Sequence, residues 1–236
     1  MNFLHYGLQR SGTNFLHQLM LKNFADVKFL NNEERALPTH KHFRLYDDKE
    51  FVPEEKYHND LHFASFEEFD EAAQYHTGVD DPKYLVIVKN PFSWYLSITK
   101  MAESLSWPSF KADAEFQEHF VRDFNGFYEK WSQFAEESDK VVLMRYEDLL
   151  EDTNHVLSLI QNQFELKRKK DLRHLFFGKK NEFFGVKRVP NSKHWGNERK
   201  DYYVNQKYYD QLGESVTEKI KATLNPALMS TLEYEL

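Results

Sequence analysis

The sequence predicts a three-layer α/β domain in which helices cover both faces of a mostly parallel sheet. Apolar runs at residues 2–6, 84–88 and 140–144 are short and nearly continuous, which is typical of strands buried on both faces. Each run is followed by polar residues and then by apolar residues at helical spacing. The chain has no internal repeat or low-complexity linker, so we expect residues 1–236 to form one domain that binds its ligand at the carboxyl ends of the strands.

The composition excludes several classes of protein. The chain contains no cysteine, which rules out disulfides, thiolate metal sites and a cysteine nucleophile. Its net charge of -7 argues against non-specific nucleic-acid binding through phosphate neutralisation. No basic and apolar leader opens the sequence, and no apolar run approaches the length of a bilayer span. We therefore expect a soluble, cytoplasmic protein, and the sequence does not indicate an oligomeric state.

The first strand, at residues 2–6, leads into a glycine loop and then a helix. Backbone N–H groups at the start of a helix lack partners within the helix, so a loop folded over that end can hold an anion. The spacing from Gly7 to Gly12 is that of a Walker A loop, but Thr-Asn follows the second glycine in place of Lys-Ser/Thr, and the cation, Arg10, lies inside the loop. This composition suits a smaller 5'-anion and does not require a metal.

The residues around Gly12 form a recognisable motif, which reads Arg10-Ser11-Gly12-Thr13-Asn14-Phe15-Leu16. It resembles the 5'-phosphosulfate loop of the sulfotransferase family, Lys/Arg-Ser-Gly-Thr-(Thr/Asn)-(Trp/Phe)-Leu. Members of this family have a P-loop-like fold and transfer a sulfuryl group from 3'-phosphoadenosine 5'-phosphosulfate (PAPS) to a hydroxyl or an amine, releasing 3',5'-adenosine bisphosphate (PAP). The resemblance implies that the donor is bound by Arg10, Ser11, Gly12, Thr13, Asn14 and Phe15.

A second motif follows the strand at residues 84–88. Asn90 is predicted to cap the next helix, and Pro91 occupies its first position, where a missing N–H costs nothing. The segment resembles the 3'-phosphate element of the same family, a strand followed by Arg-Asn-Pro and a later serine, here Ser97. The family arginine is replaced by Lys89, a point charge without the two parallel donors of a guanidinium. The resemblance implies that Lys89 and Ser97 bind the 3'-phosphate.

Two histidines after the first helix are the candidate bases. The family places a Lys-His or Lys-x-His element here, and the resemblance implies His42 as the general base, with His40 as the alternative. It also implies that Lys41 and Arg10 face the group being transferred. An imidazole can accept a hydroxyl proton near neutral pH. The competing interpretation is a pair of ordinary exposed histidines. His58 and His62 lie four residues apart, but no third ligand is evident, and we predict no metal site.

The remaining segments are assigned as follows. Residues 26–30 are expected to form a short strand, residues 66–73 an amphipathic helix, and residues 116–134 a helix whose aromatic residues pack in the core. The strand at residues 140–144 is expected to be followed by the segment at residues 145–150 and then by a helix that runs through residue 164.

Two further elements of the donor site are implied by the resemblance. A Tyr-Glu-Asp-Leu segment after the strand at residues 140–144 is similar to one in the family, which implies that Tyr146 lies beside the adenine. Family members also close the 3'-phosphate site with a basic, glycine-containing loop near the C-terminus. In this chain that loop corresponds to residues 187–196, so Arg188 and Lys193 are candidates for the 3'-phosphate.

Two alternative functions remain open from the sequence. A P-loop kinase acting on a small molecule shares the strand, glycine loop and helix, but it requires a lysine at the end of the loop. A non-catalytic nucleotide-binding protein of sulfotransferase ancestry would keep Ser11, Thr13 and Ser97 and be indifferent to His42. The acceptor is not encoded in any motif, and family analogy gives a slight preference for a carbohydrate or another small hydroxyl compound.

Overall fold

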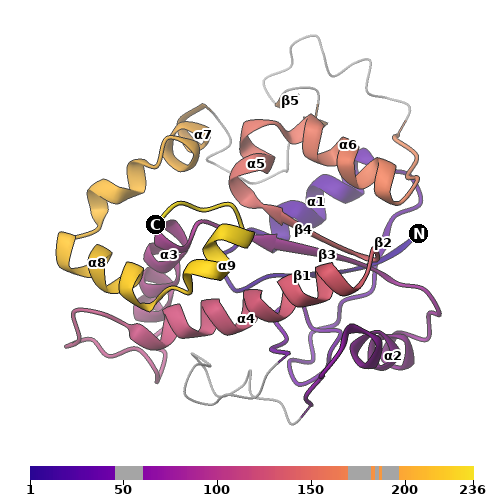
Figure 1. Ribbon diagram of the computed structural model, residues 1–236. Coiled ribbons are helices and arrows are strands. Elements are labelled where there is room, and N and C mark those ends of the chain that lie inside the picture. The colour runs from indigo at the N-terminus through magenta and orange to yellow at the C-terminus, as the bar shows by residue number, and fades with distance from the viewer. Residues whose placement is uncertain (46–60, 170–181, 184–185, 188–196) are drawn as a thin grey trace.

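A four-stranded parallel sheet forms the centre of the protein (Figure 1). The computed structural model describes residues 1–45, 61–169, 182–183, 186–187 and 197–236. The strand order is β2-β1-β3-β4, and the strands are β1 (Asn2–Tyr6), β2 (Lys28–Phe29), β3 (Lys83–Val88) and β4 (Val141–Arg145). A separate antiparallel pair consists of β5 (Glu182–Phe183) and β6 (Val186–Lys187).

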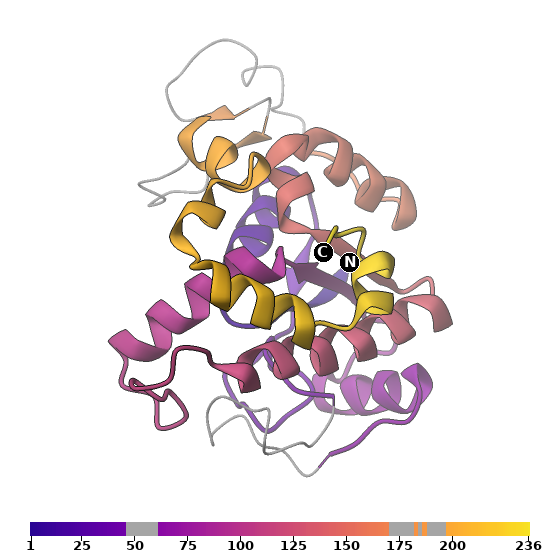
Figure 2. The ribbon, with the colours of Figure 1, turned by 60° about the vertical axis from the view of Figure 1, so that its left-hand side comes forward.

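The helices are distributed over both faces of this sheet. They are α1 (Thr13–Asn23), α2 (Phe66–Thr77), α3 (Pro91–Ser104), α4 (Glu118–Glu137), α5 (Tyr146–Glu151), α6 (Thr153–Gln163), α7 (Asn197–Val204), the 3-10 helix η3 (Lys207–Gln211), α8 (Glu214–Thr223) and α9 (Pro226–Thr231). Figures 1 and 2 show α5 and α6 on one side of the sheet and α4 on the other, with α7 beside α5.

Alternating side chains of the central strand enter two separate apolar clusters. Tyr84 and Val86 of β3 belong to one cluster, which also contains residues of α2, α3 and α4. Leu85 and Ile87 belong to the other, with residues of α1, α5 and α6. All four side chains are completely buried. A strand covered on both faces needs apolar residues at every position, which explains the continuous run in the sequence. The predicted three-layer α/β fold is confirmed.

Most predicted elements are present. The segment at residues 145–150 contains the short helix α5, and the expected helix through residue 164 is α6, which the side chain of Asp152 caps by accepting a hydrogen bond from the His155 backbone N–H at 3.0 Å. The capping residue competes with continuation of the helix, because its side chain replaces an intrahelical partner. As expected, Asn90 caps α3, accepting from the Phe92 N–H at 3.1 Å, and Pro91 is the first helical residue.

The sheet brings two loops to the same edge. Strands β1 and β3 are adjacent and parallel, with Tyr6 opposite Val86, so the residues after Tyr6 and after Val88 leave from neighbouring carboxyl ends. In open α/β sheets, ligands bind in the crevice at this edge.

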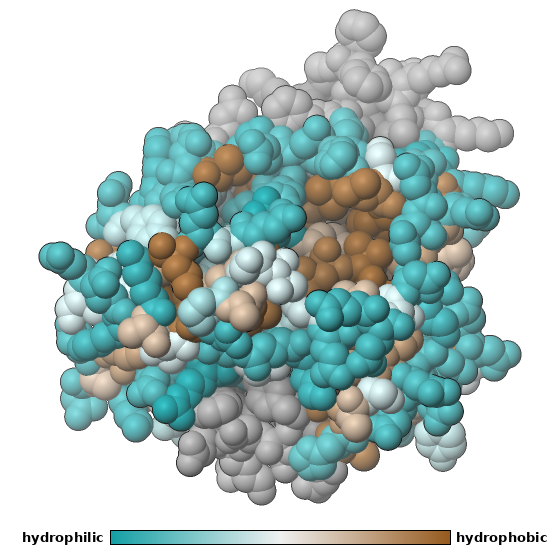
Figure 3. All heavy atoms as spheres, in the orientation of Figure 1, coloured by the Kyte–Doolittle hydropathy of each residue, from teal (hydrophilic) through white to brown (hydrophobic). Residues whose placement is uncertain are grey.

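The outer surface carries hydrophilic and hydrophobic areas. Figure 3 shows a mainly hydrophilic face on which hydrophobic side chains form separate patches. Of the helices described, none combines the length and the apolar character that crossing a membrane would require.

Candidate functional site

The loop from Gly7 to Gly12 joins β1 to α1 and leaves little space at either glycine. A Cβ atom at Gly7 would lie 2.5 Å from Ser11 Oγ and 2.7 Å from the Ile87 carbonyl oxygen. Gly12 has φ 110°, and a Cβ there would lie 2.7 Å from Cδ2 of Tyr146. Both positions therefore require glycine, the second also because L side chains rarely adopt that φ.

The first turn of α1 is arranged to hold an anion. The Phe15 N–H donates to the Gly12 carbonyl at 2.9 Å, so the N–H groups of residues 12–14 precede this hydrogen bond at the start of the helix. Ser11 is buried, and its Oγ lies against Gly7. A loop of this kind fits a phosphate or phosphosulfate group.

Lys41 lies over the same turn. Its Nζ donates to Asn14 Oδ1 at 2.9 Å, and its backbone carbonyl accepts from the Gly7 N–H at 3.2 Å. Burial lowers the pKa of Lys41 from its ordinary value, with Glu33 acting in the opposite direction. The segment with the candidate bases is thus attached to the glycine loop at two points.

Both histidines are buried, which contradicts the interpretation of an ordinary exposed pair. Nδ1 of His42 lies 2.6 Å from the Gly7 carbonyl oxygen, and the His42 N–H donates to Nδ1 of His40 at 3.2 Å. Burial lowers the pKa of His42 well below 6.5, and burial together with nearby cations lowers that of His40 to about 4. Both imidazoles are therefore neutral at pH 7.

The hydrogen bonds assign different tautomers to the two rings. A carbonyl oxygen only accepts, so Nδ1 of His42 carries the proton and Nε2 carries the lone pair. A backbone N–H only donates, so Nδ1 of His40 carries the lone pair and Nε2 the proton. The lone pair of His42 therefore lies on Nε2, and that of His40 lies on Nδ1, where it accepts from the His42 N–H.

A second group of polar side chains surrounds Lys89. Lys89 is 3% exposed, and its Nζ donates to Ser97 Oγ at 2.8 Å and to the Tyr203 hydroxyl at 3.3 Å. The ammonium also lies 4.4 Å from the centroid of the Tyr203 ring, a distance at which a cation and an aromatic face attract each other. The structure thus brings together the two residues predicted for the 3'-phosphate and adds Tyr203. No local motif marks Tyr203, since it lies on α7, far along the chain.

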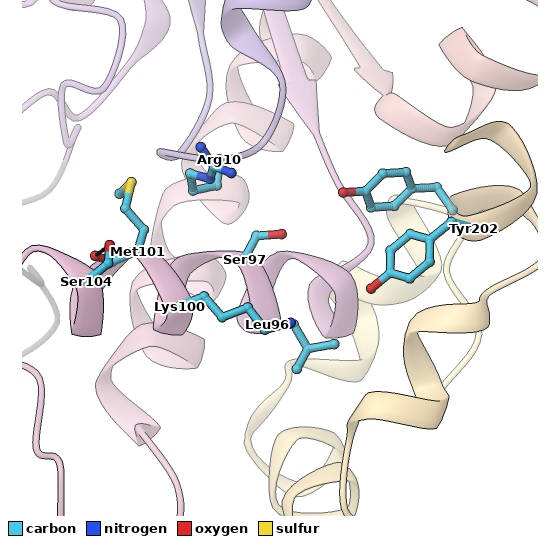
Figure 4. Close-up of a pocket in the computed structure, with 8 residues that line it drawn as sticks. Arg10, Leu96, Ser97, Lys100, Met101, Ser104 and Tyr202 are labelled. Carbon is cyan, nitrogen blue, oxygen red and sulfur yellow. Dashed lines mark hydrogen bonds between the residues drawn. The ribbon is translucent and has the colours of Figure 1, made fainter. Parts of the chain in front are cut away.

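A cleft of about 440 Å³ extends from Arg10 of the glycine loop to Ser97 and Tyr203, the partners of Lys89, and the candidate bases His40 and His42 do not line it. It is lined by Arg10, Leu96, Ser97, Lys100, Met101, Ser104, Tyr202 and Tyr203. Figure 4 shows Arg10 and Tyr202 on opposite sides of the cleft, with Ser97 and Lys100 on α3 between them. Arg10 adopts φ 70° and is exposed, so its guanidinium is available to a ligand in this cleft.

Tyr146 lies between the glycine loop and Lys89. Its ring contacts Phe15 edge-on, with centroids 5.9 Å apart, and Tyr203 edge-on, with centroids 5.2 Å apart. The ammonium of Lys89 lies 5.9 Å from the ring centroid. Phe15 and Tyr146, the two aromatic residues predicted to contact the donor, are therefore neighbours.

Three residues named from the sequence cannot be placed. Arg188, Lys193 and His58 lie outside the described residues. In the part of the chain that the structure describes, no cluster of three or more His, Asp or Glu side chains could hold a metal ion.

The sheet, the glycine loop and the buried cation define an α/β protein with a nucleotide-type anion site. The family model described as "Sulfotransferase domain" matches residues 2–231, and the chain belongs to this family. Among solved structures, the chain is similar to the sulfotransferase domain from the curacin biosynthetic pathway, with 16% sequence identity and a TM-score of 0.42. This match covers 72% of this chain and 59% of that chain.

The chain is also similar to the mouse sulfotransferase SULT7A1 complexed with PAP. The identity is 10%, the match covers 99% of this chain and 88% of that chain, and the TM-score is 0.49. A search of curated proteins gave no match.

Proposed function

We propose that the protein transfers a sulfuryl group from PAPS to a hydroxyl or amine acceptor. The observation that supports this most is the single cleft that joins Arg10 of the glycine loop to Ser97 and Tyr203, the partners of Lys89. PAPS carries anionic groups at both its 5' and 3' positions, so it requires two cationic sites at the ends of one cleft. A kinase loop would instead present a lysine at its end, where this chain has Thr13-Asn14.

The donor site in this proposal combines predicted and newly recognised residues. The N–H groups of residues 12–14 hold the 5'-phosphosulfate, together with the side chains of Arg10, Thr13 and Asn14. Lys89, Ser97 and Tyr203 hold the 3'-phosphate. Phe15 and Tyr146 flank the adenine of PAPS. Ser11 shapes the loop from inside, because its hydroxyl is buried against Gly7. Arg188 and Lys193 are further candidates for the 3'-phosphate. When bound, PAPS supplies a sulfuryl group attached to a phosphate leaving group.

The catalytic roles follow from the positions of three polar side chains. His42 accepts the acceptor proton at Nε2, while its Nδ1–H is held by the Gly7 carbonyl. Arg10 and Lys41 stabilise negative charge on the transferring and bridging oxygens. The tautomers favour His42 over His40, since the Nε2 of His40 already carries a proton.

The family match extends over residues 2–231, and both apolar clusters share one sheet, so we infer that residues 1–236 act as one sulfotransferase domain. For the acceptor we retain the preference for a carbohydrate or another small hydroxyl compound.

Calorimetric titration with PAP, and separately with ATP and Mg²⁺, tests the donor. We expect PAP to bind and ATP with Mg²⁺ to bind more weakly. Lys89→Met should weaken PAP binding by about 10- to 100-fold, because a charge-assisted hydrogen bond contributes about 1.5–3 kcal/mol. The matched control is Lys130→Met on α4, which removes a partly buried lysine that donates to Gln133 Oε1 at 3.2 Å and does not line the cleft.

Tighter binding of ATP with Mg²⁺ than of PAP would refute the proposal in favour of a kinase. Transfer from labelled PAPS to a panel of carbohydrate, phenol, lipid and peptide acceptors then tests the reaction. Binding of PAP without transfer to any acceptor would favour the non-catalytic alternative.

A further inference from the structure

A buried ion pair joins the segment with the candidate base to α4. Arg44 and Asp123 both have 0% exposed side chains, and the guanidinium binds the carboxylate through Nε at 3.0 Å and Nη2 at 2.6 Å. Such a fork-to-fork contact fixes orientation as well as distance.

The same guanidinium also contacts both halves of the candidate active site. Nη1 of Arg44 donates to the His42 carbonyl oxygen at 2.7 Å, and Nη2 donates to Oε1 of Gln9 in the glycine loop at 3.1 Å. The Gln9 carbonyl in turn accepts from Trp94 Nε1 of α3 at 2.8 Å. One planar, rigid group therefore connects the base segment, the anion loop and two helices beneath them.

Stability alone is a poor explanation for this pair. The cost of removing two charges from water offsets much of their attraction, and well-packed apolar residues of similar volume often stabilise a protein equally well. Arg44 also could not be replaced by lysine without loss, because an ammonium cannot reach Asp123, Gln9 and the His42 carbonyl with the same geometry.

We propose that Arg44, held by Asp123, is a positioning residue that fixes His42 relative to the glycine loop and thus to the transferred group. This inference rests on the proposed sulfuryl transfer. In-line displacement depends on the placement of the base, and an error of about 1 Å can reduce a rate about 100-fold.

The test uses a double variant that removes the charges together. In Arg44→Met/Asp123→Leu, no buried charge is left unpaired, so the protein should fold with a melting temperature close to that of the wild type. We expect kcat to fall about 100-fold, while KM for PAPS and the affinity for PAP change less than threefold. The matched control is Lys140→Met/Asp70→Leu, which removes the partly buried pair between Lys140 and Asp70 of α2 at 2.7 Å together with the hydrogen bond from the Tyr84 hydroxyl to Asp70. Neither Lys140 nor Asp70 lines the cleft, so kcat should be unchanged.

A second variant covers the case in which the double variant does not fold. Gln9→Met keeps the ion pair and approximately the side-chain volume but removes the contact from the loop to Arg44. We expect a loss in kcat of about 10-fold at unchanged melting temperature. Wild-type kcat in a folded double variant, or in Gln9→Met, would overturn the positioning role.

Hydrogen exchange gives a readout that does not depend on turnover. The Gly7 N–H donates to the Lys41 carbonyl at 3.2 Å and so reports on the coupling of the two segments, whereas the Phe43 N–H donates to the His40 carbonyl at 2.9 Å and reports on the order within the segment that carries His42. We expect faster exchange of these amides in the double variant. If the wild type transfers no sulfuryl group but the double variant still exchanges faster, the proposed function is wrong and the coupling of the two segments is retained. If exchange in the double variant is unchanged, the coupling itself is overturned.

Discussion

At the scale of single residues, the chemistry of the site depends on which ring nitrogen of each histidine carries the proton. His42 and His40 are close in sequence, buried and neutral, yet their hydrogen bonds to the backbone place the lone pair on opposite nitrogens. A substitution at either residue therefore tests a different role.

We expect His42→Ala to reduce kcat for sulfuryl transfer by about 100- to 10,000-fold, the contribution typical of a general base. His40→Ala serves as the comparison and should cause a smaller loss, because it removes an acceptor for the His42 N–H but no catalytic lone pair. Steady-state rates at saturating PAPS provide the measurement. A larger loss for His40→Ala than for His42→Ala would reverse the assignment.

The pH profile tests the same residue. Burial, opposed by the Gly7 carbonyl and reinforced by Arg44, Lys41 and His40, lowers the pKa of His42, so the neutral ring persists below pH 6.5. The acid limb of kcat/KM should therefore have its midpoint below 6.5, and activity should be lost only as the pH falls through that midpoint. An acid limb centred above 6.5 would be inconsistent with His42 as the base.

At the scale of elements, the turn between β1 and α1 packs closely against α5. Gly12 in this turn lies against the ring of Tyr146, the first residue of α5. The sequence predicted that the glycine loop holds an anion at the start of the helix. The structure shows that the absence of a side chain at Gly12 also makes room for this ring. Gly12 and Gly78 both have positive φ, but only a Cβ at Gly12 would be crowded, so a comparison of the two positions distinguishes backbone strain from steric overlap.

We expect Gly12→Ala to prevent PAP binding and to lower stability by clearly more than 1 kcal/mol, because the new methyl group would overlap Tyr146 in addition to straining the backbone. Gly78→Ala is the control. Gly78 has φ 66°, and a Cβ there would meet none of the described residues within 4 Å, so its cost should be about 1 kcal/mol. Urea denaturation and PAP calorimetry provide the two measurements. Equal effects at both positions would mean that the contact with Tyr146 contributes nothing.

At the scale of the whole molecule, several buried neutral histidines make stability depend on pH. Burial and the nearby His17 and Lys41 lower the pKa of His5 from 6.5 to about 3, against the opposing effect of its hydrogen bond to Asn31. Between these two values the unfolded chain binds a proton that the folded chain does not, so the free energy of unfolding rises with pH. The contribution of His5 is fully present above pH 6.5 and decreases as the pH falls toward 3.

We expect acidification from pH 6.5 to 5 to lower the free energy of unfolding through His5 by about 2 kcal/mol, since one pKa unit corresponds to about 1.36 kcal/mol. His5→Asn keeps a donor for Asn31 and should have a correspondingly flatter profile in urea denaturation. Above pH 6.5 the profiles of variant and wild type should run parallel. Glu147, whose buried carboxyl has a raised pKa, acts in the opposite direction in both proteins and cancels in the difference. Parallel profiles below pH 6 would disprove the role of His5.

The sequence by itself determined the elements and the two motifs. Continuous apolar runs specify strands buried on both faces, and Asn90-Pro91 specifies a helix start through local capping and the fixed φ of proline. The two motifs were predictable because each lies within one continuous stretch of strand, turn and helix. The first is the glycine loop, and the second contains Lys89 and Ser97.

Only the tertiary structure decided which distant residues meet. Tyr203 reaches Lys89 from α7, and Asp123 reaches Arg44 from α4, contacts that no sequence spacing encodes. Burial made the two candidate histidines neutral, and their hydrogen bonds to the backbone fixed their tautomers. The charge and the tautomer of an imidazole depend on what surrounds the ring in the folded protein, which its neighbours along the chain do not specify. Local sequence sets backbone preference, whereas desolvation and long-range hydrogen bonds exist only after the layers have packed.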